Sequence, residues 1–111
     1  MIITGIVLKG KGKGEQTGLK TANLDINLAP NLTEGLYTCQ VNLRNKIYKG
    51  LLYYGYNSLS KLNCLEVHIL NFNKNIYNQQ ITVEIKKYLR PPKKFKTIKE
   101  LSRQIKKDLE R

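Results

Sequence analysis

Six short runs of alternating apolar and polar residues constrain the fold of this chain most, because turn residues separate them and no helical pattern lies between them. The runs cover residues 2–9, 22–28, 35–43, 46–56, 64–73 and 79–89. Without crossover helices, neighbouring runs are expected to pair as antiparallel strands. We therefore expect a mainly β fold, a six-stranded antiparallel barrel that is closed so that no sheet edge stays exposed.

Two of these runs indicate which of their faces meets the core. Every second residue from Tyr37 to Leu43 is apolar, and Ile81, Val83 and Ile85 alternate with polar residues. Between the third and fourth runs, the pair Asn45-Lys46 predicts a tight hairpin turn. Each strand is therefore expected to bury one face.

After the last run the period of the pattern changes. Pro91 and Pro92 end the strand, and apolar residues then recur at spacings of three and four, which predicts an amphipathic C-terminal α-helix packed on the barrel. The residues of this apolar stripe are Ile98, Leu101, Ile105 and Leu109. Thr97 and Glu100 form a predicted capping box at its start. A chain of 111 residues is too short for two cores, so residues 1–111 are expected to form a single domain.

The chain is strongly basic, with 20 Lys and Arg against 8 Asp and Glu and a net charge of +12. Such a charge attracts nucleic acid, an anionic membrane surface or a small phosphorylated ligand, and it also fits a surface that only serves solubility. No apolar run approaches the roughly 20 residues of a membrane span, and the N-terminal sequence lacks a signal-peptide pattern. Cys39 and Cys64 lie apart in strand-like runs, which suits reduced thiols in a cytoplasmic protein.

The lysine- and glycine-rich stretch before residue 20 predicts a phosphate-binding loop. Glycines at every second position let backbone N–H groups approach an anion, and the lysines between them add positive charge. The spacing matches neither GxxxxGK[ST] nor GxGxxG followed by a helix, so neither of those mechanisms is supported. The predicted phosphate-binding residues are Gly10, Lys11, Gly12, Lys13, Gly14 and Gly18. A basic surface hairpin is the alternative interpretation.

Three residues beyond this loop suggest a cation site and a proton acceptor. Thr21 and Asn23 are two residues apart, so in a strand their side-chain oxygens share one face and suit a hard cation such as Mg²⁺, although both also occur as ordinary polar strand residues. Glu66 is a carboxylate inside the most apolar run, on the face of His68. It could point into the barrel mouth and take a proton, whereas its position alone favours a solvent-facing or Lys-paired carboxylate.

At this point the chain resembles the riboflavin kinase family over nearly its whole length. The resemblance begins with Gly5, Val7 and the glycine loop, and Thr21-Ala22-Asn23-Leu24 is similar to the family's Pro-Thr-Ala-Asn signature. Later blocks follow in the family's order, and they are residues 30–37, 54–57, 65–70 and 88–91 with Phe95, Leu101, Ile105 and Asp108. In this order the blocks are specific, although each alone is weak.

The resemblance implies a riboflavin kinase that transfers the terminal phosphate of ATP, or of another nucleoside triphosphate, to the 5′-hydroxyl of riboflavin and so makes FMN. It implies that Mg²⁺ is held by Thr21 and Asn23, and that Glu66 is the general base. It also implies flavin contacts from Asn57, Arg90 and Phe95. The expected partners are these small molecules rather than nucleic acid or a membrane, and we expect a monomeric, stand-alone kinase module.

The chain also departs from the family's pattern. Lys20 stands where the signature has proline, which removes a fixed φ and adds a cation beside the predicted metal site. Ser58-Leu59 and Asn71 also differ from the usual family residues. Two other functions therefore stay open: a flavin- or nucleotide-binding module with impaired catalysis, and a basic barrel that binds single-stranded nucleic acid through its tyrosines.

Overall fold

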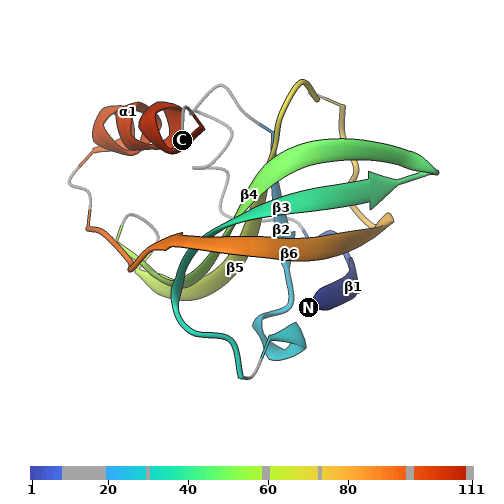
Figure 1. The fold of residues 1–111 in the computed structure, drawn as a ribbon, viewed down its shortest axis with the longest axis horizontal. Coiled ribbons are helices and arrows are strands. Elements are labelled where there is room, and N and C mark those ends of the chain that lie inside the picture. Colours follow the sequence, from blue (N-terminus) through green and yellow to red (C-terminus); the bar gives the residue numbers. More distant parts are fainter. Residues whose placement is uncertain (9–19, 30, 59–60, 73, 95–96, 110–111) are drawn as a thin grey trace.

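The fold is a curved sheet of six strands with a helix set to one side of it (Figure 1). This computed structural model describes residues 1–8, 20–29, 31–58, 61–72, 74–94 and 97–109. In chain order the elements are β1 (Ile2–Ile6), β2 (Lys20–Leu24), the 3-10 turn η2 (Ile26–Leu28), β3 (Gly35–Leu43), β4 (Lys46–Asn57), β5 (Leu62–Ile69), β6 (Gln80–Arg90) and α1 (Ile98–Leu109).

The strands follow the order β1-β6-β3-β4-β5-β2, and every neighbouring pair is antiparallel. The prediction of six antiparallel strands is therefore confirmed. The prediction of a closed barrel is wrong: β1 and β2 are the two edges of the sheet, and among the described residues one isolated bridge, from Leu8 just after β1 to Asn23 of β2, lies between these edges. The architecture is a half-barrel.

The chain just after β1 continues its pairing with the segment before β6. The Val7 N–H donates to the Gln79 carbonyl at 2.9 Å, and the Asn78 N–H donates to the Val7 carbonyl at 2.8 Å. These bonds tie Val7 to the segment before β6, so Leu8 is the residue that bonds to β2, with its N–H 2.7 Å from the Asn23 carbonyl.

Two local boundaries differ from the sequence prediction. The expected strand 22–28 ends at Leu24, because the Asp25 carboxylate accepts a hydrogen bond from the Asn27 N–H at 2.9 Å and starts the turn η2. The hairpin after β3 turns at Arg44 and Asn45, whose φ values of 52° and 67° are left-handed, one position earlier than predicted. Paired positive φ values are typical of the tight turns that connect antiparallel strands.

The core lies on the concave side of the sheet and uses the faces that the alternation predicts. From β3 it takes the residues Tyr37 to Leu43 at every second position, and from β6 it takes Ile81, Val83 and Ile85. Leu65, Val67 and Ile69 of β5 also belong to it and are at most 1% exposed. Complete burial of such an aliphatic side chain stabilises a fold by about 1.5–3 kcal/mol.

The helix α1 begins after Thr97, whose hydroxyl accepts the Glu100 N–H at 3.2 Å. Lys93 Nζ donates to Gln104 Oε1 at 2.8 Å, and Gln104 is only 9% exposed, so this bond ties the helix to the segment after β6. The side chains of the predicted apolar stripe, from Ile98 to Leu109, lie outside the described ones. Within the described part of the chain, no helix has the length and apolar character to span a membrane.

Candidate active site

Strand β5 separates core residues from polar residues by simple alternation. Leu65, Val67 and Ile69 face the core, so Glu66 and His68 lie on the opposite face of the sheet. Of the two orientations considered for Glu66, the one that points into a barrel mouth is wrong, because the residues on both sides of it occupy the interior. Glu66 is half-buried on this outer face, and His68 is only 3% exposed.

The pairing of β2 with β5 places the two predicted metal residues beside these polar groups. Thr21 is directly opposite His68, and Asn23 is directly opposite Glu66. Directly opposite residues in an antiparallel pair project their side chains to the same side of the sheet. The hydroxyl, the amide and the carboxylate are therefore neighbours on one outer face, although the carboxylate is more than 40 positions from the other two groups in the sequence.

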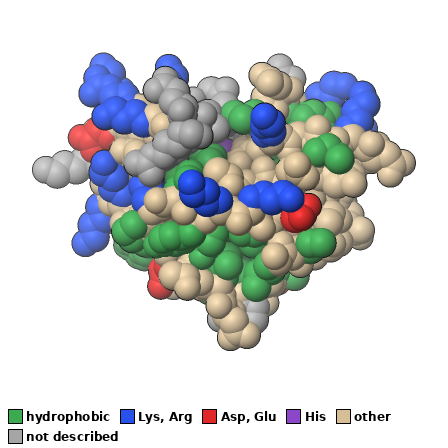
Figure 2. Space-filling model, viewed as in Figure 1, with side chains coloured by type: hydrophobic (Ala, Val, Ile, Leu, Met, Phe, Trp, Pro, Cys, Tyr) green, Lys and Arg blue, Asp and Glu red, His purple; other side chains and the backbone are tan. Residues whose placement is uncertain are grey.

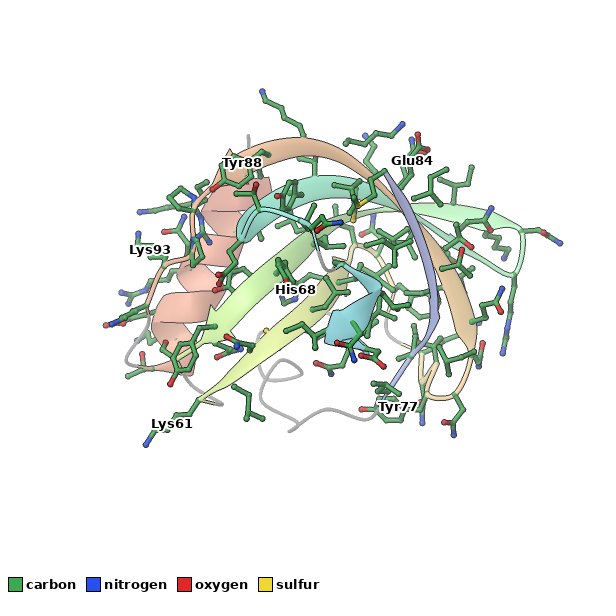
Figure 3. The ribbon with its side chains drawn as sticks, turned by 90° about the horizontal axis from the view of Figure 1, so that it is seen from below. Lys61, His68, Tyr77, Glu84, Tyr88 and Lys93 are labelled. Atoms are coloured by element: carbon green, nitrogen blue, oxygen red, sulfur yellow. The ribbon has the colours of Figure 1, made fainter. Side chains whose placement is uncertain are left out.

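A buried hydrogen bond joins the first of these pairs. Thr21 Oγ1 lies 3.0 Å from His68 Nδ1, and the two residues are 4% and 3% exposed. Figure 3 shows His68 near the middle of the molecule, whereas Lys61 and Lys93 lie at its periphery. Alternation within each strand does not pair Thr21 with His68. The pair follows from the register of β2 on β5.

The carboxylate of Glu66 has neighbours on two strands. Asn57 Nδ2, at the end of β4, donates to Glu66 Oε1 at 3.4 Å, a long bond. The pKa of the Cys64 thiol is raised, first by burial and then by the charge and hydrogen bond of Glu66. Asn57, predicted as a flavin contact, therefore touches the predicted base itself. Both Cys64 and Cys39 are free thiols, as the sequence predicted.

Tyr53 is a residue of this face to which the sequence analysis gave no role in the catalytic site. It lies directly opposite Glu66 on β4, and its hydroxyl donates to the Tyr56 carbonyl at 2.6 Å. Burial raises the pKa of Tyr53 to about 12, and Cys64, Glu34 and Glu66 add to the rise while Arg90 opposes it. Tyr53 is therefore a neutral hydroxyl beside the carboxylate at physiological pH.

Of the remaining predicted site residues, Arg90 lies in the part of the chain that the structure describes, and the others lie outside it. Arg90, at the end of β6, donates from Nη1 to the Pro91 carbonyl at 3.2 Å and lies opposite Leu36, which in turn lies opposite Tyr53. It therefore belongs to the neighbourhood of the outer polar face. Outside the described residues lie Gly10, Lys11, Gly12, Lys13, Gly14, Gly18 and Phe95.

The donor set on this face suits a hard cation. A hydroxyl, an amide oxygen and a carboxylate are ligands that Mg²⁺ accepts. Among the described residues no group of three or more His, Cys, Asp or Glu side chains could hold a metal ion. At nucleotide sites Mg²⁺ usually takes one or two protein ligands together with substrate phosphates and waters, and the oxygens of Thr21 and Asn23 could supply such ligands.

A half-barrel with oxygen donors and one carboxylate on its outer face is a site of the kind that phosphotransferases use. More specifically, the family model of riboflavin kinase (Flavokinase) matches residues 1–111, and the chain belongs to this family.

Comparison with individual proteins agrees with the family. The chain is 37% identical to the "Trifunctional protein RibF/MnmA" of Mycoplasmoides gallisepticum, over 96% of this chain and 17% of that protein. It is 30% identical to the riboflavin kinase of Homo sapiens, over 96% of this chain and 74% of that protein. A crystal structure described as a macrolide-efflux protein from Streptococcus pneumoniae has a TM-score of 0.83 and 28% identity, over 98% of this chain and 37% of that one.

The chain spans only part of most of these relatives. Its coverage is 17% of the Mycoplasmoides protein and 35% of a bifunctional riboflavin kinase/FMN adenylyltransferase of Bacillus subtilis. The similarity therefore concerns the riboflavin kinase portion of such proteins.

Proposed function

We propose that this chain transfers the terminal phosphoryl group of a nucleoside triphosphate to the 5′-hydroxyl of riboflavin, giving FMN and the nucleoside diphosphate. The observation that carries the proposal is the strand register that sets Thr21 and Asn23 beside His68 and Glu66 on one face of the sheet. Membership of the riboflavin kinase family supports the identity of the substrate. ATP is the first donor to test, and a monomer acting in the cytoplasm is part of the same proposal.

Glu66 has the role of general base in this reaction. Its carboxylate accepts the proton of the 5′-hydroxyl as that oxygen forms a bond to the terminal phosphorus, while the bond from this phosphorus to the bridging oxygen breaks and the diphosphate leaves. The contact from Asn57 supports the role, because it helps to fix the orientation of the carboxylate. General base catalysis of this kind contributes about 10²–10⁴-fold to a rate.

The oxygens of Thr21 and Asn23 would hold Mg²⁺, which when bound offsets the negative charge of the phosphates. The backbone amides of Gly10, Gly12, Gly14 and Gly18, together with Lys11 and Lys13, have the role of binding these phosphates from the other side. Arg90 and Phe95 remain the proposed flavin contacts, with Asn57 at the edge of the same site. Arg90 lies opposite Leu36 of β3, which in turn lies opposite Tyr53.

Binding of a polyanion by the basic surface is a second candidate function. Lys99, Arg103, Lys106 and Lys107 are exposed on α1, and Lys94 is exposed just before it. Figure 2 shows Lys and Arg side chains at several places around the rim of one face, with few acidic ones. One relative in Bacillus subtilis is named an RNA-binding riboflavin kinase. Retention on single-stranded RNA that weakens steeply with salt would support this function.

The kinase proposal is tested by incubating the folded protein with riboflavin, Mg²⁺ and either ATP or CTP, and by separating FMN chromatographically. We expect FMN to form, and Thr21→Val to lower the rate by roughly 10²-fold. Thr4→Val is the matched control, because Thr4 bonds to Thr82 on an exposed part of the sheet, away from this site. Riboflavin binding without turnover would favour the impaired module. The absence of both binding and turnover would exclude both flavin functions.

A further inference from the structure

The buried bond between Thr21 and His68 bears directly on how Thr21 could serve a cation. A threonine hydroxyl carries one proton and two lone pairs. If Oγ1 is to give a lone pair to a cation and stay neutral, its proton must be directed to another acceptor. The atom at hydrogen-bond distance is His68 Nδ1, 3.0 Å away, and a neutral imidazole can accept a proton there.

The surroundings hold this pair in place. Thr21 and His68 face each other across the β2–β5 ladder, and Leu51 of β4 lies on the other side of His68. The backbone of β4 also packs closely against His68, because a Cβ at Gly50 would lie 2.6 Å from the His68 carbonyl oxygen. With exposures of 4% and 3%, the hydroxyl and the imidazole have little room to take other orientations.

We infer that His68 is a positioning residue for the metal-binding hydroxyl, accepting the Thr21 proton at Nδ1 so that the lone pairs of Oγ1 are available to the cation. This inference rests on the proposed function, since it assigns a role to a second residue of the same site. It makes His68 a partner of a ligand and not a ligand or a base itself. Partners of this kind typically change metal affinity by about 10–100-fold when they are removed.

The inference distinguishes the two ring nitrogens of His68, and two variants test this distinction. His68→Asn keeps an acceptor oxygen near the position of Nδ1. His68→Gln, the matched control, reaches instead toward the position of Nε2. Both variants place a neutral amide in the same buried site, so a general loss of packing or polarity affects them alike. Thermal unfolding of both proteins checks that they are folded before binding is measured.

The measurement is the affinity for ADP, by isothermal titration calorimetry, with and without Mg²⁺. In the parent protein we expect Mg²⁺ to strengthen ADP binding. In His68→Gln the gain from Mg²⁺ should fall by about tenfold, whereas His68→Asn should retain most of it. In a Thr21→Val background, the Gln substitution should cause no further loss of the gain, because the hydroxyl on which it acts is gone.

Three results would overturn the inference: an unchanged gain in His68→Gln, equal losses in the Asn and Gln variants, or losses that add fully to that of Thr21→Val. The proposed function fails differently, since the parent protein would then form no FMN from riboflavin under any nucleotide. If FMN forms and Mg²⁺ does not change ADP binding, the kinase proposal survives and the role of His68 is rejected.

Discussion

The two faces of β5 carry different kinds of residue, core residues on one and the candidate catalytic residues on the other. On one face Leu65, Val67 and Ile69 are at most 1% exposed and pack into the core. On the other face Glu66 and His68 have side-chain partners in Asn57 and Thr21. No buried side-chain nitrogen or oxygen among the described residues lacks a hydrogen-bond partner. The comparison shows that one strand can place stabilising core residues on one face and the candidate catalytic residues on the other.

The largest expected effect comes from breaking the polar face alone. Glu66→Gln keeps the shape of the side chain and an oxygen for Asn57 but cannot accept the substrate proton, so FMN formation should fall by about 10²–10⁴-fold. The urea midpoint should hardly change, because Glu66 is outside the core. Glu84→Gln is the control, since Glu84 is an exposed carboxylate on β6 paired with Lys86 at 2.9 Å. Similar rate losses in both variants would contradict the assignment.

A substitution on the core face alone should have the opposite effects, a lower stability and a nearly unchanged rate. Leu65 is 1% exposed, so Leu65→Ala should lower the free energy of unfolding by about 2–5 kcal/mol through lost burial and a residual cavity. Under conditions where the variant is folded, its rate of FMN formation should stay close to that of the parent protein. Leu62→Ala, on the same strand but 49% exposed, should change stability little. Denaturant titration and the kinase assay on the same samples separate the two effects.

The two faces differed in how far the sequence could predict them. The strand Gly35–Leu43 and the buried faces of β3 and β6 follow from alternation, which is a local property. The same rule places Thr21 with Asn23, and Glu66 with His68, each pair within its own strand. It does not give the register of β2 on β5, because that pairing joins residues 47 positions apart and depends on the packing of the whole sheet. The Thr21–His68 bond therefore appears only in the structure.

Incomplete closure of the barrel had the same kind of origin. The expected run 2–9 pairs with β6 and with the segment before it, and among the described residues it contacts β2 through the bridge from Leu8 to Asn23. Likewise, Asp25 ends β2 by capping a turn, although residues 22–28 continue the apolar pattern. At the end of β2, a hydrogen bond from the Asn27 N–H to the Asp25 side chain overrode a pattern that was compatible with a longer strand.

A smaller effect should follow from loosening the partner of Glu66. Asn57→Ala removes the donor to Oε1, and because the 3.4 Å bond is long, we expect a loss of about 1 kcal/mol in transition-state stabilisation, or about fivefold in rate. Asn63→Ala, an exposed amide on β5, is the matched control and should leave the rate unchanged. A loss in Asn57→Ala as large as that in Glu66→Gln would show that Asn57 has a more direct role in the reaction.

A further effect is expected at alkaline pH, because burial raises the pKa of acids on both faces, among them Cys39 and Tyr53. Cys39 on the core face has its pKa raised from 9.0 to about 12, and Tyr53 on the outer face from 10.0 to about 12. A raised pKa in the folded state means that this stability is present below the unfolded value and is lost as pH rises toward the folded value.

The urea midpoint should therefore begin to fall above about pH 9 and continue to fall toward pH 12. Cys39→Ala should make the fall shallower from pH 9 upward, and Tyr53→Phe should do so only above pH 10. Unfolding titrations at several alkaline pH values measure both effects. Identical pH dependence in the parent protein and both variants would show that neither acid contributes.

The central claim is that the outer face of β2 and β5 carries the reaction, and a crystal structure with riboflavin, ADP and Mg²⁺ tests it most directly. The account predicts the metal ion beside Thr21 and Asn23, and the riboflavin 5′-hydroxyl about 2.6–3.2 Å from the Glu66 carboxylate, the reach that proton transfer requires. Ligands bound elsewhere, with Glu66 out of reach of the 5′-hydroxyl, would contradict it.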